Sequence, residues 1–293
     1  TKLIFNIIIY VIITSFFIYL LIYEKKIGAK IKEYRAIAAE KISDFCGVKD
    51  EGGRRGIKKS VDIIETLGSA IVLVLIIQHF YIGNFLVPTG SMEPTIMPKD
   101  RLLGDMMSYR LFGKPKRGDI IVFKEPVQDK LLYTKRLIAL PGDRVRVGDD
   151  GHLYINGKVQ TGGKLSRQYT QKGFMTNKEW VVPKKGDTVQ IIGAQILYGE
   201  GQESIEQMDI ATLQSMIKDN DEKVKEAALI PLARFLLNDK YETGPILDFK
   251  YNNELSKELV EGKKIVLKED YYLVLGDNTN NSFDSRYWGF VSE

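Results

Sequence analysis

Two polar residues far apart in the chain are of the types needed for nucleophilic attack on a carbonyl. Ser91 lies in the run Val87-Pro88-Thr89-Gly90-Ser91-Met92-Glu93-Pro94-Thr95, whose proline and glycine residues indicate a tight turn. A serine hydroxyl needs a base, and Lys135 lies in a segment, Leu132–Ile138, that we expect to be a strand. Burial beside Tyr133 would lower the lysine pKa to about 7–8, which suits a general base. A solvated strand lysine is the alternative.

Other catalytic chemistries have few residues to work with. His79 and His152 are the two histidines, too few for an ordinary zinc site or for a convincing serine–histidine pair. Cys46 is the single cysteine and lies in a basic connector, so no disulfide is expected. We therefore expect no metal and no cofactor. Ser215 and Lys218 match a Ser-x-x-Lys pattern but lack its partner motifs.

A polar loop follows the expected strand Tyr271–Leu275. It reads Gly276-Asp277-Asn278-Thr279-Asn280-Asn281-Ser282-Phe283-Asp284-Ser285-Arg286-Tyr287-Trp288-Gly289. Asx turns and an aspartate–arginine pair can hold such a loop for purely structural reasons. Loops of this composition also carry functional residues.

Two apolar runs precede these residues. Leu3–Tyr23 has no charged residue, and Leu67–Val87 has only Gln78, His79 and Asn84 as strongly polar interruptions. About 20 such residues cross a bilayer, so we expect transmembrane helices at 1–23 and 67–87 rather than buried core helices or a cleaved signal peptide. Thr1 is an unusual first residue, and we expect at least one residue to precede it.

The connector 24–66 is basic. Residues 24–60 hold 11 Lys/Arg against 6 Asp/Glu, which places the connector in the cytoplasm and residues 88–293 on the outer face. Apolar residues at helical spacing predict an amphipathic helix that lies on the membrane or packs against the spans. Gly52-Gly53-Arg54-Arg55-Gly56 is expected to break the chain before the next helix.

Residues 88–293 are expected to form a mainly β domain. They carry 30 basic and 30 acidic side chains, a balance that excludes a nucleic-acid-binding surface. Asn156-Gly157 predicts a hairpin, and residues 203–238 predict a helical insertion. The expected strands are Asp119–Lys124, Leu132–Ile138, Arg144–Val147, Leu153–Gln160, Val189–Tyr198, Lys264–Lys268 and Tyr271–Leu275.

Four segments in order carry a resemblance to a known family. The chain resembles the bacterial type I signal peptidase (leader peptidase) family, in the segments Thr89–Thr95, Arg117–Phe123, Lys135–Asp143 and Gly276–Gly289. The resemblance implies a signal peptidase-like antiparallel β fold with two N-terminal transmembrane helices. It covers roughly 88–160 and 264–291 densely, and the helical insertion lies outside it.

The resemblance also implies roles for single residues. Ser91 matches the nucleophile and Lys135 the general base of a Ser/Lys dyad. Thr89 matches the hydroxyl that completes the oxyanion hole with the Ser91 N–H. The residues that match the family's support for the dyad are Ser282, which would position the lysine amine, and Asp277, Asp284 and Arg286. The substrate-pocket residues it implies are Val87, Met92, Ile96 and Tyr133.

The activity implied is removal of N-terminal signal peptides from exported preproteins, cut after small-x-small residues through an acyl-enzyme. The partners implied are signal peptides, the phospholipid membrane and the protein export machinery, and the location is the bacterial cytoplasmic membrane. Thr279, Asn280 and Phe283 depart from the family's usual loop. A specialised Ser/Lys protease for a narrow set of exported proteins, or a membrane-anchored β scaffold without catalysis, are the alternatives.

Overall fold

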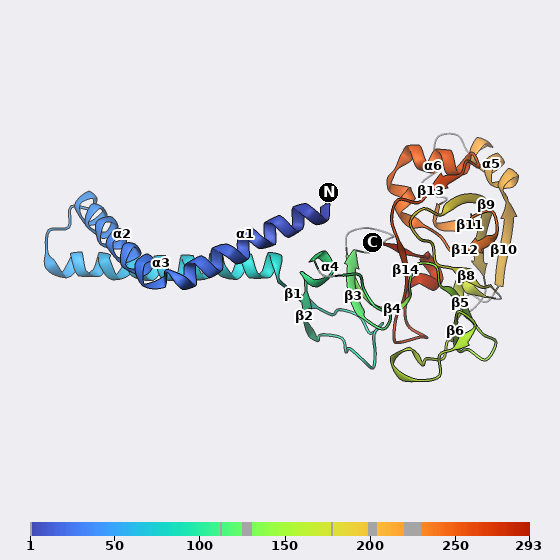
Figure 1. Ribbon diagram of the computed structural model, residues 1–293, viewed down its shortest axis with the longest axis horizontal. Helices are drawn as coiled ribbons and strands as arrows, with labels where there is room; N and C mark the ends of the chain where they lie inside the picture. Colours follow the sequence, from blue (N-terminus) through green and yellow to red (C-terminus); the bar gives the residue numbers. More distant parts are fainter. Residues whose placement is uncertain (1, 112, 125–130, 177, 199–203, 220–229) are drawn as a thin grey trace. The chain divides into compact units, whose positions relative to one another are not determined.

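The computed structural model describes residues 2–111, 113–124, 131–176, 178–198, 204–219 and 230–293. The chain divides into two units. The first comprises Thr1–Phe85 with Arg101–Lys114, and the second comprises Leu86–Asp100 with Pro115–Glu293. Figure 1 shows the first unit as long helices with a small sheet and the second as a set of sheets.

Three long helices form most of the first unit. They are α1 (Lys2–Ile22), α2 (Glu24–Phe45) and α3 (Glu51–Phe80). The Asp50 side chain caps α3 by accepting a hydrogen bond from the Gly53 N–H at 2.7 Å. The predicted break at Gly52–Gly56 is therefore wrong, because these residues form the first turns of α3. The cap offsets the low helix propensity of glycine.

One described helix, α3, is long and apolar enough by itself to cross a membrane, and none of its residues is buried. Ile7–Leu20 and Glu24–Phe45 reach this standard only as a pair bent by 80°. The predicted second span also ends too late. The helix stops at Phe80, and Ile82–Leu86 form strand β1, which pairs with β2 (Arg101–Asp105). Short helix α4 (Ser108–Leu111) follows.

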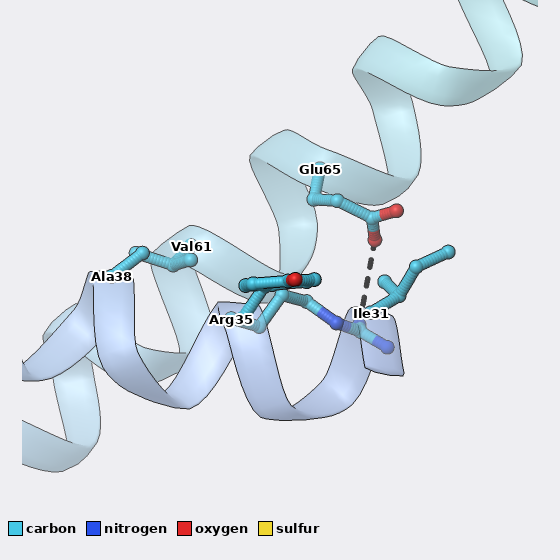
Figure 2. Close-up of a pocket in the computed structure, with 6 residues that line it drawn as sticks. Ile31, Arg35, Ala38, Val61 and Glu65 are labelled. Atoms are coloured by element: carbon cyan, nitrogen blue, oxygen red, sulfur yellow. Dashed lines mark ion pairs between the residues drawn. The ribbon is translucent and has the colours of Figure 1, made fainter. Parts of the chain in front are cut away.

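The connector helix α2 packs against α3, which was one of the two possibilities for it. The guanidinium of Arg35 lies 3.5 Å from the carboxylates of both Asp62 and Glu65. Between the two helices lies a cavity of about 360 Å³ lined by Ile31, Tyr34, Arg35, Ala38, Val61 and Glu65. Figure 2 shows the two helices side by side there, with the Arg35–Glu65 ion pair between them.

In the second unit, one antiparallel sheet carries Lys135. Its order is β15 (Val291–Ser292), β14 (Tyr271–Leu275), β4 (Leu132–Ala139) and β3 (Ile120–Lys124). Strand β14 is buried at every position, as its unbroken apolar run predicts. The ladder between β14 and β4 begins at Leu275↔Arg136, so it starts one residue after Lys135.

A second sheet has the order β7 (Lys158–Val159), β6 (Leu153–Ile155), β5 (Arg144–Val147) and β8 (Trp180–Val181). The predicted Asn156-Gly157 hairpin is confirmed. Both residues have positive φ, 51° and 75°, which suits a two-residue turn. The 3₁₀ turns η1 (Gly163–Leu165) and η2 (Gly173–Met175) precede β8.

The third sheet corrects the prediction for residues 203–238. Long strand β9 (Thr188–Tyr198) pairs with β10 (Ser204–Asp209), β11 (Ala233–Leu237) and β13 (Ile265–Val266), and β12 (Tyr241–Thr243) adds to β11. Only α5 (Ile210–Asp219) is an α-helix among the described residues of that stretch. Pairing with β9 overrides the helical propensity of residues such as Glu206 and Met208 in β10 and Ala233 and Leu236 in β11. Residues 203 and 220–229 lie outside the described residues.

The remaining elements complete the core. They are η4 (Ile230–Leu232), η5 (Leu247–Tyr251), α6 (Asn253–Val260) and α7 (Ser285–Trp288). Buried residues from all three sheets form one apolar cluster that includes Leu153, Phe235 and Leu273. Strand β14, which leads directly into the polar loop, contributes Leu273 and Leu275 to this cluster. Ser215 of the Ser-x-x-Lys pattern bonds within α5, to the Thr212 carbonyl at 2.8 Å.

Candidate active site

The turn that carries Ser91 is held by backbone hydrogen bonds at both of its ends. The Val87 N–H donates to the Asp100 carbonyl at 3.0 Å, and the Lys99 N–H donates to the Val87 carbonyl at 2.7 Å. Inside the turn, Met92 is only 1% exposed and anchors the segment in the protein. Ser91 itself is half-buried. The turn therefore presents the hydroxyl on a fixed backbone.

Lys135 meets Ser91 from strand β4. Its Nζ lies 2.7 Å from the Ser91 Oγ and 5.1 Å from the centre of the Tyr133 ring. The side chain is 4% exposed. Burial lowers the pKa of Lys135 to about 8, the negative charge of Asp284 opposes this in part, and Arg286 adds to it. A substantial fraction of this lysine is therefore neutral near pH 8.

The oxyanion-hole candidates belong to the same turn as Ser91. Thr89 is exposed and precedes Ser91 by two residues. Among the described residues, the Ser91 N–H donates no hydrogen bond, while the Ser91 carbonyl accepts one from the Asn278 N–H at 3.1 Å. A free N–H next to the nucleophile can bind a developing negative oxygen.

Asp277 contacts the turn rather than the lysine. Its carboxylate accepts hydrogen bonds from Arg136 Nε at 2.8 Å, from Arg136 Nη2 at 2.6 Å and from the Thr95 hydroxyl at 2.5 Å. Burial pushes the pKa of Asp277 upward, but the bonds from Arg136 and Thr95 outweigh it and the pKa is lowered. A direct bond between Asp277 and the dyad lysine is thus not seen. Through Thr95, Asp277 instead holds the segment that follows Ser91.

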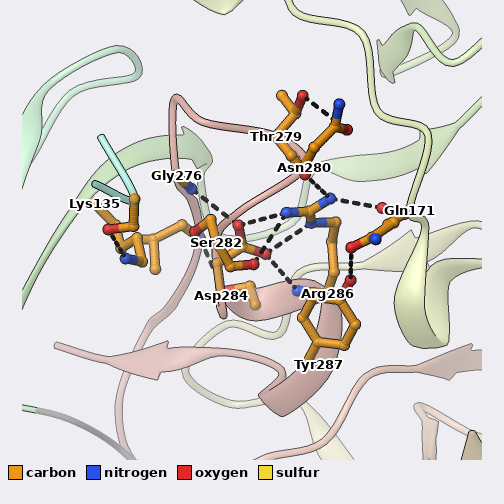
Figure 3. Close-up of polar contacts among 12 residues, drawn as sticks. Lys135, Gln171, Gly276, Thr279, Asn280, Ser282, Asp284, Arg286 and Tyr287 are labelled. Carbon is orange, nitrogen blue, oxygen red and sulfur yellow. Dashed lines mark hydrogen bonds and ion pairs between the residues drawn. The ribbon is translucent and has the colours of Figure 1, made fainter. Parts of the chain in front are cut away.

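Asp284 and Arg286 form the predicted ion pair, and both are fully buried. Arg286 donates from Nε to Oδ1 of Asp284 at 2.8 Å and from Nη2 to Oδ2 at 2.9 Å. Its Nη1 donates to the carbonyls of Gln171 and Thr279, and the Gly276 N–H donates to Asp284. Figure 3 shows the guanidinium at the centre of this network. The pair therefore fixes the shape of the loop.

Ser282 lies in the same loop, and the expected hydrogen bond between its hydroxyl and the lysine amine is not seen among the described residues. Its side chain is buried, and its Oγ has no hydrogen-bond partner within the described residues. A Cβ added to Gly276 would lie 2.1 Å from this Oγ, so the hydroxyl sits against the start of the loop. The position requires glycine at 276.

The expected pocket residues differ in exposure. Val87, Met92 and Ile96 are all buried, so they can form only the inner wall of a binding site. Tyr133 is half-buried beside the amine of Lys135.

Arg136 and Asn278 are site residues that the sequence reasoning missed. Arg136 follows Lys135 and lies on the opposite face of the strand. That alternation, together with an acidic residue in the loop as a possible partner, was the sequence signal from which its role could have been inferred. For metal binding, no group of three or more His, Cys, Asp or Glu side chains occurs in the described parts of the chain.

A serine within hydrogen-bond distance of a buried lysine of lowered pKa is a site suited to a serine hydrolase. The family model described as "Signal peptidase, peptidase S26" matches residues 60–293. The chain belongs to this family of serine peptidases, as the resemblance predicted.

The individual matches agree with that family. The signal peptidase I of Buchnera aphidicola subsp. Baizongia pistaciae is 30% identical over 80% of this chain and 74% of its own length. That of Aquifex aeolicus is 32% identical over 75% of each chain. A crystal structure of a signal peptidase I from Enterococcus faecalis matches at 23% identity, covering 61% of this chain and 90% of that one, with a TM-score of 0.24. The assignment rests on the sequences and not on this superposition.

Proposed function

We propose that this chain is a membrane-anchored endopeptidase that removes N-terminal signal peptides from exported preproteins by means of a Ser91/Lys135 dyad. Family membership and the names of the relatives support the reaction. The single observation behind the dyad is the 2.7 Å separation of the Ser91 Oγ and Lys135 Nζ in a buried setting. The lowered pKa of Lys135 lets this amine act as a base near neutral pH.

Acylation begins when the neutral amine of Lys135 takes the Ser91 proton. The Ser91 Oγ then bonds to the scissile carbonyl carbon, and the carbonyl oxygen becomes an oxyanion. We expect the Ser91 N–H and the Thr89 hydroxyl to bind that oxygen, where one donor typically contributes about 3–4 kcal/mol. The C–N bond breaks as the Lys135 ammonium donates its proton to the leaving amine.

Deacylation uses the same groups in reverse. Lys135, neutral again, takes a proton from water, and the hydroxyl attacks the acyl carbon. The ester bond to Ser91 breaks, and the ammonium returns a proton to the Ser91 Oγ. Lys135 is thus base and acid in turn, which a pKa near the working pH favours.

A peptide substrate has a strand edge available beside the dyad. Strand β14 pairs with β4 only from Arg136 onward, so the ladder on that side starts just after Lys135. An extended peptide that pairs with the part of β4 before Arg136 would add a strand to the sheet. Its alternate side chains would then face the wall that contains Val87 and Ile96. Small side chains at those alternate positions suit a wall whose residues are already closely packed.

The membrane location follows from the helices. Helix α3 meets the length and hydropathy of a span, and the exposed apolar side chains of α1 suit a second one. The basic charge of the connector supports a cytoplasmic connector, with residues 88–293 on the outer face of a bacterial inner membrane. Ser91 follows the end of α3 at Phe80 by 11 residues, which keeps it within about 40 Å of that end.

The test is cleavage of a purified preprotein by the detergent-solubilised chain. Ser91→Ala and Lys135→Arg are expected to abolish product, because alanine has no hydroxyl and guanidinium stays charged. Arg117→Lys, at a partly exposed ion pair with Asp143, is the matched control and keeps activity. Cleavage by Ser91→Ala at the wild-type site would refute the nucleophile. Binding of the preprotein without cleavage by the wild-type chain would favour a non-catalytic scaffold.

A further inference from the structure

The side chain of Asn278 holds the peptide group whose N–H lies beside the nucleophile. Its Nδ2 donates a hydrogen bond to the Gly90 carbonyl at 3.0 Å. That carbonyl and the Ser91 N–H belong to the same peptide group. The backbone N–H of Asn278 also donates to the Ser91 carbonyl, at 3.1 Å. Asn278 therefore donates hydrogen bonds to the carbonyl that precedes the Ser91 N–H and to the carbonyl of Ser91 itself.

Because the peptide group is planar, the hydrogen bond to the Gly90 carbonyl also fixes the direction of the Ser91 N–H. In a planar trans peptide the C=O and N–H point in opposite directions, so fixing one fixes the other. Among the described residues the only cis bond is Glu93–Pro94, and the Gly90–Ser91 bond is trans. A donor on the Gly90 carbonyl thus aims the Ser91 N–H to the other side of the plane.

Glycine at position 90 makes this external control necessary. Glycine populates more backbone conformations than any other residue, so the peptide plane after it can turn easily. The Gly90 carbonyl also accepts from the Glu93 N–H at 3.1 Å, but that bond lies within the turn itself. Asn278 comes from the loop after β14, which the buried Asp284–Arg286 pair holds. Within the described part of the chain, the Asn278 side chain is the group from outside the turn that bonds to this peptide plane.

We infer that Asn278 is a positioning residue for the oxyanion hole, acting through the Gly90–Ser91 peptide group. This rests on the proposed function, in which the Ser91 N–H binds the oxyanion. Asn278 bonds to the backbone on either side of Ser91 and not to the reacting atoms, the Ser91 Oγ and the Lys135 Nζ. Its effect falls on the transition state and leaves substrate binding and the base unchanged.

The experiment compares Asn278→Ala and Asn278→Asp in preprotein cleavage. Aspartate has the size of asparagine but cannot donate to the Gly90 carbonyl. Both variants are expected to lose about 10- to 100-fold in kcat, below the effect of deleting a donor outright, with KM within about twofold of wild type. Asn281→Ala and Asn281→Asp are matched controls, because Asn281 is exposed in the same loop. They are expected to keep wild-type kcat.

A peptide aldehyde provides a readout that a general loss of structure would not give. Its adduct with Ser91 carries an oxygen in the oxyanion position, whereas the matching peptide alcohol forms no adduct. Aldehyde affinity is expected to fall in Asn278→Ala by about the factor lost in kcat, and alcohol affinity is expected to stay unchanged. Equal losses for both compounds would overturn the inference, since they would indicate a damaged binding site.

Other outcomes separate this inference from the proposed function. Wild-type kcat in Asn278→Asp, together with an inactive Ser91→Ala, would refute the positioning role and leave the dyad intact. Full activity of Ser91→Ala would refute the dyad and the inference together. A fall in kcat for Asn281→Asp equal to that for Asn278→Asp would assign the effect to charge in the loop and would also overturn the inference.

Discussion

The buried base Lys135 has a cost in stability that can be measured. Its pKa of about 8, against an ordinary value of 10.5, corresponds to about 3 kcal/mol of penalty for charging the folded protein. Below pH 8 the amine is charged in both the folded and the unfolded state, so the penalty is complete. Between pH 8 and 10.5 the unfolded state binds more protons, and stability rises with pH.

Lys135→Met removes the charge and keeps most of the side-chain volume. The variant also loses the hydrogen bond to Ser91, which contributes about 1 kcal/mol. We therefore expect Lys135→Met to be about 2 kcal/mol more stable than wild type at pH 7, which raises Tm by about 4–8 °C for a domain of this size. The gain shrinks steadily from pH 8 upward and becomes a loss of about 1 kcal/mol above about pH 10.5, where only the missing hydrogen bond remains.

Thermal unfolding of both proteins in the same detergent, across pH 6 to about 11, measures this difference. Lys158→Met is the control, because Lys158 is exposed on short strand β7 and its replacement leaves the pH dependence of wild type unchanged. A Lys135→Met variant that is less stable than wild type at pH 7 would refute the reasoning. So would a gain that is the same at every pH.

Three other predictions concern the neighbours of the dyad. Asp284→Asn leaves Arg286 charged and buried without its partner, so it lowers the free energy of unfolding by about 3–5 kcal/mol in thermal unfolding. It also shifts the pH midpoint of activity below about 8, because the negative charge of Asp284 stabilises the charged form of Lys135. An unchanged midpoint would contradict this. Thr89→Ala lowers kcat by about 10²–10³-fold and Thr89→Ser restores most of it, so equal kcat values for the two would exclude the Thr89 hydroxyl from the oxyanion hole. Ser282→Ala leaves Tm unchanged or higher, because the buried Oγ has no partner among the described residues, and a large fall in Tm would show that the hydroxyl has one.

The strands around the site were predictable because their patterns are local. Arg144–Val147 and Tyr271–Leu275 have the predicted bounds, and the hairpin at Asn156-Gly157 follows from its turn residues. The Ser91 and Lys135 assignments came from the order of the segments. Their 2.7 Å approach could not be predicted, because it depends on how a turn and a strand 44 residues apart pack together.

The failures have long-range causes as well. Residues 204–209 and 233–237 have helical composition but pair with β9, a partner the local pattern does not specify. The second apolar run ends in strand β1 because Ile82–Leu86 pairs with residues 101–105. The resemblance implied only that Asp277 supports the dyad, without naming its contacts. Its real partners, Arg136 and Thr95, come from two other segments and could be seen only once the chain is folded.

The dependence of kcat/KM on pH for preprotein cleavage tests the central claim most directly. A neutral Lys135 acting as base predicts a rise of about tenfold per pH unit at low pH and a plateau above a midpoint of about 8. Asn281→Ala should keep that midpoint, and Lys135→Met should lose activity at every pH. A midpoint near 6, or activity in Lys135→Met with the same pH dependence, would contradict the assignment of Lys135 as the base.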